Sequence, residues 1–167
     1  LVKAAKSHRN ERLSLLLQTI CSTGIRVSEH RFVTVEALQT GQVQISNKGK
    51  SSVWSSCQGN CVGFCCNFVK KRDLPRAVFV TRTGKPMNRT NIWCMMKRLC
   101  AQAHVDSQKV FPHNLRHLFA LTFYRMEKDI VRLADILGHS SIETTRIYTL
   151  TSSTEHAKAI SRLHLLI

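Results

Sequence analysis

A histidine- and arginine-containing segment opens an apolar stretch of the chain, which runs from Pro112 to Arg125. Proline is favoured at the first helical position, so Pro112 predicts a helix start, with His113 and Arg116 on one face. An arginine at a buried helix start is costly unless an anion meets it, and the free N–H groups there favour phosphate. The alternative is pairing with a buried carboxylate, and the chain has only 10 Asp and Glu residues.

Two further segments carry cations at predicted turns. Arg26 follows a glycine turn in STGIRVSEH, where Glu29, one turn later, could orient its guanidinium. Lys48 and Lys50 stand in NKGK, a natural hairpin turn from which a lysine can reach a bound backbone. Taken singly, these segments are better explained as a surface ion pair and a solvated turn.

The fourth segment is LGHSSIETTRIYT, which places His139 just past a predicted helix end and Tyr148 nine residues later. Polar neighbours surround Tyr148, so we expect its hydroxyl to stay in contact with water. The other tyrosine, Tyr124, lies within the apolar run and is expected in the core. The fourth segment alone does not identify a function.

Most of the elements that must position these side chains are helical. Apolar residues recur at helical spacing from Glu11, and Gly24 ends that helix as a C-cap. A further helix that starts at Pro112 is apolar enough to be deeply buried. We expect Asp129 and Ser140 to cap helices, with Gly138 as a helix end. The other predicted helices are 27–32, 88–103 and 153–166, and the predicted strands are 42–46, 51–55 and 78–81. The fold class is therefore mainly α with a small antiparallel β-sheet (α+β).

Length and charge limit the classes of protein to which the chain can belong. The chain has 167 residues and a formal net charge of +15, and 43% of it is apolar. This predicts one compact domain with a real core and excludes a disordered basic tail. No apolar run approaches the roughly 20 residues of a membrane span. The charge favours a polyanion, DNA or RNA first, although a basic solvated surface would give the same composition.

The seven cysteines do not form a complete internal disulfide set, because their number is odd. The cluster from Cys57 to Cys66 has C-x3-C-x3-C-C spacing, which differs from the C-x2-C pairs of zinc sites. Spacings of four place three of its cysteines on one helical face. We interpret them as small apolar fillers in a reducing compartment, with a metal site as the less favoured alternative.

In this order the four segments resemble the catalytic domain of the tyrosine recombinases, the phage integrase family. STGIRVSE is similar to the first-arginine box, NKGK to the hairpin lysine, HNLRH to the H-x-L-R-H box and LGHSSIETTRIYT to the nucleophile box. The resemblance spans nearly the whole chain and is nearest to integrases of Gram-positive mobile elements. It implies a metal-independent DNA strand-breaking and rejoining enzyme without a cofactor.

The resemblance also implies roles. Tyr148 would be the nucleophile that forms a 3′-phosphotyrosyl bond, and Arg26, Arg116 and His139 would bind the phosphate. Lys48 would be the general acid, with Lys50 as its rival, and His113 the general base or a further phosphate contact. Glu29 and His117 would support these groups. The remaining expected DNA contacts are Lys50, Arg82, Lys85, Arg89 and Arg146.

Partners and boundaries follow from the same resemblance. We expect double-stranded DNA, further copies of the protein as a tetramer on that DNA, possible accessory excision factors, and a bacterial cytoplasmic location with no membrane. Residues 1–167 would form one catalytic domain without the usual N-terminal core-binding domain. Residues 153–167 would form a helix exchanged with a neighbouring subunit. The alternatives are a non-enzymatic DNA-binding module and a type IB topoisomerase.

Overall fold

The structure, a computed structural model, describes residues 1–7, 10–40, 43–47, 50–54, 60–72, 77–81 and 83–148. The chain divides into two compact units, Leu1–Ala120 and Leu121–Ile167. The described residues are mostly helical in both units, as the sequence predicts.

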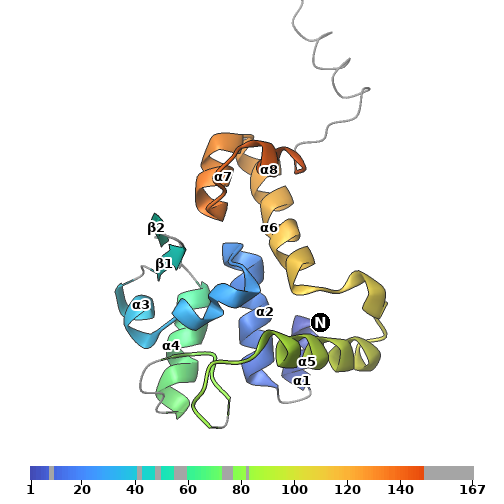
Figure 1. Ribbon diagram of the computed structural model, residues 1–167. Helices are drawn as coiled ribbons and strands as arrows, with labels where there is room; N and C mark the ends of the chain where they lie inside the picture. Colours follow the sequence, from blue (N-terminus) through green and yellow to red (C-terminus); the bar gives the residue numbers. More distant parts are fainter. Residues whose placement is uncertain are drawn as a thin grey trace, which may run out of the picture. The chain divides into compact units, whose positions relative to one another are not determined.

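The first unit consists of helices around one central helix, joined by a hairpin and short turns (Figure 1). Its elements in chain order are α1 (Val2–Ser7), α2 (Glu11–Thr23), the 3-10 helix η1 (Val27–Phe32), α3 (Val35–Thr40), β1 (Val43–Asn47), β2 (Lys50–Trp54), α4 (Asn60–Arg72), α5 (Arg89–Gln102), η2 (Ser107–Lys109) and the first part of α6 (Pro112–Glu127). The predicted segment 27–32 is thus a tight 3-10 helix.

Helix α2 forms the centre of the core, and its boundaries match their sequence signals. The Asn10 side chain caps its start by accepting a hydrogen bond from the Leu13 N–H at 3.2 Å. Gly24 ends the helix in the left-handed conformation, with φ at +69°. Its buried apolar side chains follow the predicted helical spacing: Leu13, Leu16, Leu17 and Ile20.

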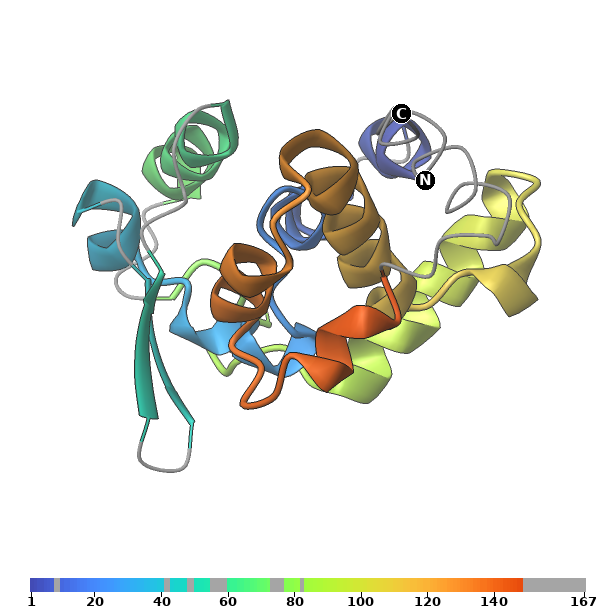
Figure 2. The same ribbon diagram turned by 90° about the horizontal axis from the view of Figure 1, so that it is seen from above.

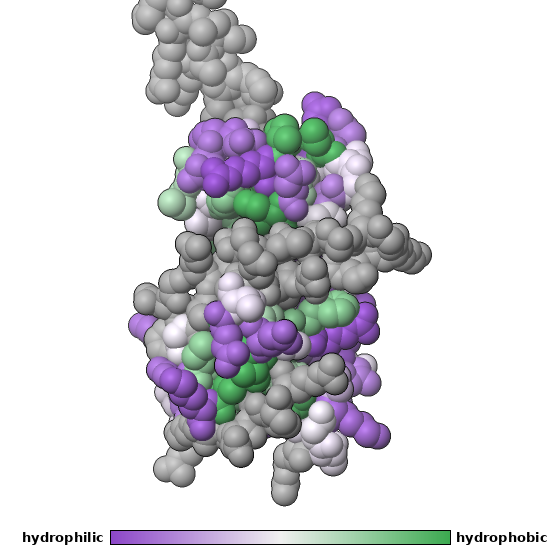
Figure 3. All heavy atoms as spheres, turned by 90° about the vertical axis from the view of Figure 1, so that its left-hand side faces the viewer, coloured by the Kyte–Doolittle hydropathy of each residue, from purple (hydrophilic) through white to green (hydrophobic). Residues whose placement is uncertain are grey.

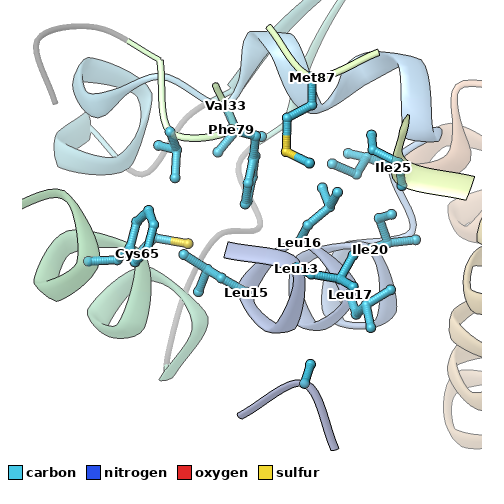
Figure 4. Packing of buried hydrophobic residues seen from close by; sticks show 14 of the residues in the cluster. Leu13, Leu15, Leu16, Leu17, Ile20, Ile25, Val33, Cys65, Phe79 and Met87 are labelled. Atoms are coloured by element: carbon cyan, nitrogen blue, oxygen red, sulfur yellow. The ribbon is translucent and has the colours of Figure 1, made fainter. Parts of the chain in front are cut away.

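Side chains from several elements converge on α2 (Figure 4). Val33, Phe79 and Met87 point toward it from one side, and Cys65 of α4 lies beside Leu15. Cys65 is buried, and its sulfur lies 3.9 Å from the Thr19 hydroxyl. This agrees with the interpretation of Cys65 as a core filler; Cys57 lies outside the described residues.

The β1 and β2 backbones pair antiparallel, from Val43 opposite Trp54 to Asn47 opposite Lys50. The hairpin extends away from α3 and α4 (Figure 2). Lys48 and the residue after it lie outside the described residues.

The predicted strand at 78–81 is wrong. This segment makes only isolated bridges, Thr34 with Ala77 and Val80 with Pro86. Val78 and Phe79 are buried in the core, and no neighbouring segment in the described chain runs long enough beside them to form a ladder. An apolar run of four residues does not by itself separate a strand from a buried extended segment.

Helices α5 and α6 begin as predicted. The Asn88 side chain accepts a hydrogen bond from the Thr90 N–H at 2.8 Å and caps α5, and Pro112 is the first residue of α6. The expectation that α6 is deeply buried is wrong, because only Arg116 and Ala120 are buried along it. The unit boundary falls within α6, and Leu115 in its first part packs against the core around α2.

The second unit contains the end of α6, then α7 (Ile130–Leu137) and α8 (Glu143–Arg146). The Asp129 carboxylate caps α7 by accepting from the Arg132 N–H at 2.9 Å, and Gly138 ends it with φ at +62°. The sequence predicted both the Asp129 cap and the helix end at Gly138. The predicted Ser140 cap is wrong, because the hydroxyl of the next residue, Ser141, accepts from the Glu143 N–H at 3.2 Å.

Several apolar side chains remain exposed in the second unit, among them Met126, Val131, Ile142 and Ile147. Figure 3 shows such hydrophobic surface, in green, beside hydrophilic surface over the part that holds α7 and α8. No helix among the described residues has the length and apolar character needed to cross a bilayer. The predicted helix at 153–166 lies outside the described residues.

Candidate active site

Arg26 is held by a carboxylate three residues away, as its spacing predicts. Glu29 Oε2 accepts from the Arg26 backbone N–H at 2.7 Å, and Glu29 Oε1 accepts from Arg26 Nη1 at 2.8 Å. The Glu29 side chain is 5% exposed, whereas that of Arg26 is 40% exposed. A buried carboxylate therefore fixes the arginine at both ends and leaves part of its guanidinium facing solvent.

His30, which sequence reasoning missed, follows directly. It is buried, its Nδ1–H donates to the Val27 carbonyl, and its ring meets the Phe79 ring edge-on. Burial lowers the pKa of His30, and the charge of Arg31 lowers it further, against hydrogen bonding to the Val27 and Met87 backbone. The 3-10 helix that carries Arg26 and Glu29 is thus anchored by a histidine that favours the neutral form.

Arg116 is buried at the start of α6, with 4% of its surface exposed. Its Nη1 donates to the Gly24 carbonyl at 2.7 Å, across 92 residues of sequence. This carbonyl belongs to the C-cap of α2, where helix carbonyls lack intrahelical partners. A hydrogen bond to the end of the central helix is therefore one of the interactions that hold Arg116 in position.

Gly24 leaves no room for a side chain. A Cβ atom there would lie 2.4 Å from the Phe119 ring, which is one turn after Arg116 on α6. The close approach of α6 to the α2 C-cap brings the Arg116 side chain within reach of the Gly24 carbonyl. Glycine is required here by both the positive φ and the contact.

A cleft of about 510 Å³ joins these groups in the first unit. Arg26, Arg116 and Arg89 line it, together with His113 at the start of α6. Its other lining residues are Ile25, Val27, Ser28, Trp93, Phe111, Pro112 and Asn114. Three guanidinium groups with few acids nearby make a site suited to an anion such as phosphate.

His139 and Tyr148 come together within the second unit. Their rings are nearly parallel, 14° apart, with centroids 6.5 Å from each other. His139 Nδ1 lies 2.8 Å from the hydroxyl of Thr145, which is fully buried, and the Tyr148 N–H donates to the Thr145 carbonyl at 3.0 Å. Thr145, another residue that sequence reasoning did not single out, thus links the two. The expectation of a water-exposed Tyr148 is wrong, since its side chain packs beside His139 and the residue is only 5% exposed.

The remaining predicted residues fall in different places. His117 is half-buried after Arg116 and is not among the cleft-lining residues; Lys85 is exposed on a turn. Arg146 is exposed and pairs with Glu143 at 3.2 Å. Lys48 and Arg82 lie outside the described residues, and so does the side chain of Lys50.

Trp93 and Phe111 are two aromatic residues of the cleft that the sequence did not reveal. Trp93 lies four residues before Lys97 on α5, a spacing that places both on one helical face and could have drawn attention to it. No comparable signal marks Phe111. Within the described ranges, no three His, Cys, Asp or Glu side chains are grouped to hold a metal ion.

Comparison with known proteins relates the chain to one family. Residues 1–155 match the model of the phage integrase family. Tyrosine recombinase XerD of Staphylococcus saprophyticus subsp. saprophyticus is 27% identical over 158 residues, which cover 89% of this chain and 53% of XerD. The chain therefore spans about half the length of this curated relative.

Solved structures give the same result. The crystal structure of XerA recombinase matches with a TM-score of 0.78 and 26% identity over 99% of this chain and 62% of XerA. The XerH site-specific recombinase bound to its difH substrate matches with a TM-score of 0.72 and 24% identity, over 90% of this chain and 46% of XerH. Since the family match covers most of the sequence, the chain belongs to the phage integrase family.

Proposed function

We propose that this chain is the catalytic part of a site-specific DNA recombinase of a bacterial mobile element, acting in the cytoplasm. It cleaves one DNA strand through Tyr148 and rejoins it to a partner strand. The observation that carries the proposal is the cleft in which Arg26 and Arg116 lie together with His113. Membership in the phage integrase family supports it.

In the proposed step, the Tyr148 hydroxyl oxygen attacks the scissile phosphorus as His113 takes up its proton. The bond from phosphorus to the 5′ oxygen breaks, Lys48 protonates that oxygen, and a 3′-phosphotyrosyl bond remains. The covalent bond conserves the phosphodiester for rejoining, when the same transfers run in reverse. Tyr148 must turn outward from its buried position to react.

The arginines would stabilise the extra negative charge that develops on the phosphate oxygens. Arg26 is held by Glu29 and Arg116 by the Gly24 carbonyl, so both side chains are oriented before DNA binds. In other enzymes a preorganised donor of this kind contributes about 3–4 kcal/mol to the transition state. Planar guanidinium groups can also bind phosphate oxygens bidentately, which a lysine ammonium does not.

His139 would add a further donor. When the Thr145 hydroxyl donates to Nδ1, the neutral imidazole carries its proton on Nε2 and can donate it to a phosphate oxygen. Thr145 would thus select the tautomer. This assigns a role to the buried hydroxyl that lies between His139 and Tyr148 in the chain.

We also propose the wider partners. Double-stranded DNA is the substrate, as the difH-bound XerH structure supports by similarity of fold, with further copies of the protein assembling as a tetramer. Lys50, Arg82, Lys85, Arg89 and Arg146 would contact the DNA backbone, and β1–β2 would be the small sheet of the α+β fold that carries Lys48. Residues 153–167 would dock on a neighbouring subunit, with excision factors as accessory partners.

The test uses duplexes with a nick near the centre and randomised central base pairs, so that cleavage releases a short fragment and traps the covalent intermediate. After denaturation, wild-type protein should give a protein–DNA band that protease removes. Tyr148→Phe should give none, because it lacks the nucleophilic oxygen. Tyr124→Phe is the matched control, since Tyr124 and Tyr148 are the two tyrosines in the chain.

Binding of the duplexes with no denaturation-resistant band would favour a non-enzymatic DNA-binding module instead. A band that persists in Tyr148→Phe would remove Tyr148 from the proposed role. Relaxation of any supercoiled plasmid, without joining of two different duplexes, would favour a topoisomerase. The first and third outcomes therefore separate the proposed recombinase from its alternatives, and the second tests the role of Tyr148.

A further inference from the structure

Two exposed aromatic side chains stand in the wall of the arginine-lined cleft. Trp93 of α5 is 45% exposed and Phe111, just before α6, is 38% exposed. Neither belongs to the hydrophobic core cluster around α2. Large aromatic rings left in contact with water beside cationic groups are typical of binding surfaces rather than of structural packing.

Lys97 fixes the two rings in place. Its Nζ lies 4.1 Å from the centroid of the Phe111 ring and 5.4 Å from that of Trp93. The same ammonium donates to the Val110 carbonyl at 3.2 Å and to the Ser107 carbonyl. Lys97 therefore joins α5 to the segment that enters α6. It also holds the two rings in their orientation in the absence of a ligand.

This arrangement combines the two features that bind an unpaired nucleotide. Guanidinium groups hold the phosphate, and aromatic faces stack on the base, which is tolerant of sequence because every base has such a face. A cleft of about 510 Å³ lies within the range of small-molecule sites, about 300–1,000 Å³. Arg26, Arg89 and Arg116 line the same cleft as the rings.

We infer that Trp93 and Phe111 form a stacking site for the base of the nucleotide whose phosphate the cleft arginines bind. The inference rests on the proposed function, in which a cleaved strand must leave its duplex before it joins another. A base freed from pairing next to the cut would stack on these rings. Lys97 is a positioning residue for the site, acting through Phe111 and Trp93.

The test isolates the fluorescence of Trp93. Because the chain has two tryptophans, Trp54→Phe leaves Trp93 alone. This variant also carries Tyr148→Phe, so that no cleavage intervenes. It is titrated with a 12-nucleotide oligothymidylate and with an abasic 12-mer of equal charge. We expect the thymidylate to quench Trp93 and to bind about tenfold more tightly than the abasic strand.

Matched variants in the same Tyr148→Phe background then assign the effect, with binding followed by anisotropy of a labelled oligonucleotide. Trp93→Leu and Phe111→Leu should each reduce the preference for the base-containing strand, and retained thermal unfolding shows that the fold persists. Tyr124→Leu is the control, because Tyr124 also lies under a lysine, Lys128, at 5.4 Å, but does not line the cleft. Lys97→Arg should retain the preference, and Lys97→Met should lose it.

Equal binding of the two strands, or equal quenching by both, would overturn base stacking and leave only a backbone contact. An unchanged preference in both Leu variants would place the stacking elsewhere. These outcomes are distinct from failure of the proposed function. A protein that forms the covalent band without base preference refutes only the stacking site, whereas base preference without the band refutes only the recombinase.

Discussion

At the scale of single residues, Glu29 decides how Arg26 is presented. Its carboxylate accepts from both the backbone and the guanidinium of Arg26 while almost fully buried. Glu29→Gln keeps the shape of the side chain but replaces one of its two acceptor oxygens by an amide NH2, which donates and so cannot accept from Arg26. We expect the free energy of unfolding to fall by about 1–3 kcal/mol, as measured by urea denaturation, and formation of the covalent band to weaken.

Glu36→Gln is the control for this change, because Glu36 is an exposed carboxylate on α3. It should alter the free energy of unfolding by no more than about 0.5 kcal/mol. If the two substitutions had equal effects on stability, the buried contacts of Glu29 with Arg26 would contribute nothing to the fold.

His30 gives the molecule an acid-sensitive point. Because burial lowers its pKa in the folded state, the unfolded chain binds the proton more readily. Above the pKa of about 6.5 that His30 has in the unfolded chain, the histidine is neutral in both states and does not affect stability. As the pH falls below that value, proton binding by the unfolded chain lowers the stability of the fold. We expect thermal stability to drop between about pH 7 and pH 5, and less steeply in His30→Leu.

The comparison with His30→Leu isolates the contribution of this residue to the pH dependence of stability. His104→Asn provides a second control, since His104 is exposed and adopts a positive φ that Asn tolerates. An unchanged pH profile in His30→Leu would show that protonation of His30 does not oppose folding.

At the scale of elements, the junction of α2 and α6 depends on Gly24. Alanine there would place its Cβ 2.4 Å from the Phe119 ring, at a φ of +69°. We expect Gly24→Ala to lower the free energy of unfolding by more than the roughly 1–2 kcal/mol of a positive φ alone, and to displace Arg116. Urea denaturation measures the first effect and binding of phosphate-containing ligands the second.

Gly84→Ala separates conformational strain from the contact. Gly84 has φ at +76° and no atom within 4 Å of a built Cβ. Gly84→Ala should therefore lower the free energy of unfolding only by the amount that the positive φ costs. If both substitutions lowered the free energy of unfolding equally, the Phe119 ring would move aside from the new Cβ without a free-energy penalty.

Sequence signals predicted those elements whose boundaries depend on local chemistry. Gly24, Pro112, Asp129 and Gly138 each act on backbone groups within a few residues, and each lies where it was expected. The Arg26–Glu29 pair was predictable for the same reason.

Features that need a distant partner were not predictable. The extended segment at Val78 makes no strand, because pairing depends on a neighbour that the sequence does not reveal. Arg116 finds the Gly24 carbonyl across 92 residues, and Lys97 joins two rings from separate elements. The family resemblance implied that Arg26 and Arg116 act together, but no sequence signal marked Phe111 as part of the same cleft.

At the scale of the whole molecule, the net charge of +15 should make DNA binding strongly dependent on salt. Each phosphate neutralised contributes a slope of about −0.9 to a plot of log affinity against log salt concentration. We expect Arg89→Gln, which removes an exposed cation from the cleft, to reduce the slope by about that amount. The measurement is anisotropy with a labelled duplex at several salt concentrations.

Lys97→Gln is the matched control in the same helix. Its ammonium is already bound to backbone carbonyls and ring faces, so the slope should not change even if affinity falls. A loss of slope in Lys97→Gln equal to that in Arg89→Gln would mean that Lys97 contacts DNA phosphate directly.

The hydrogen bond from Arg116 to Gly24 also bears on the order of folding. Arg26 is placed by a residue three positions away, so its geometry can form as soon as that short segment exists. Arg116 requires closure of a loop of 92 residues, which is slow and entropically costly. We therefore expect the Arg26–Glu29 geometry to form early in folding. In the proposed function the two arginines act together, so that function would require α6 to have docked on α2 first.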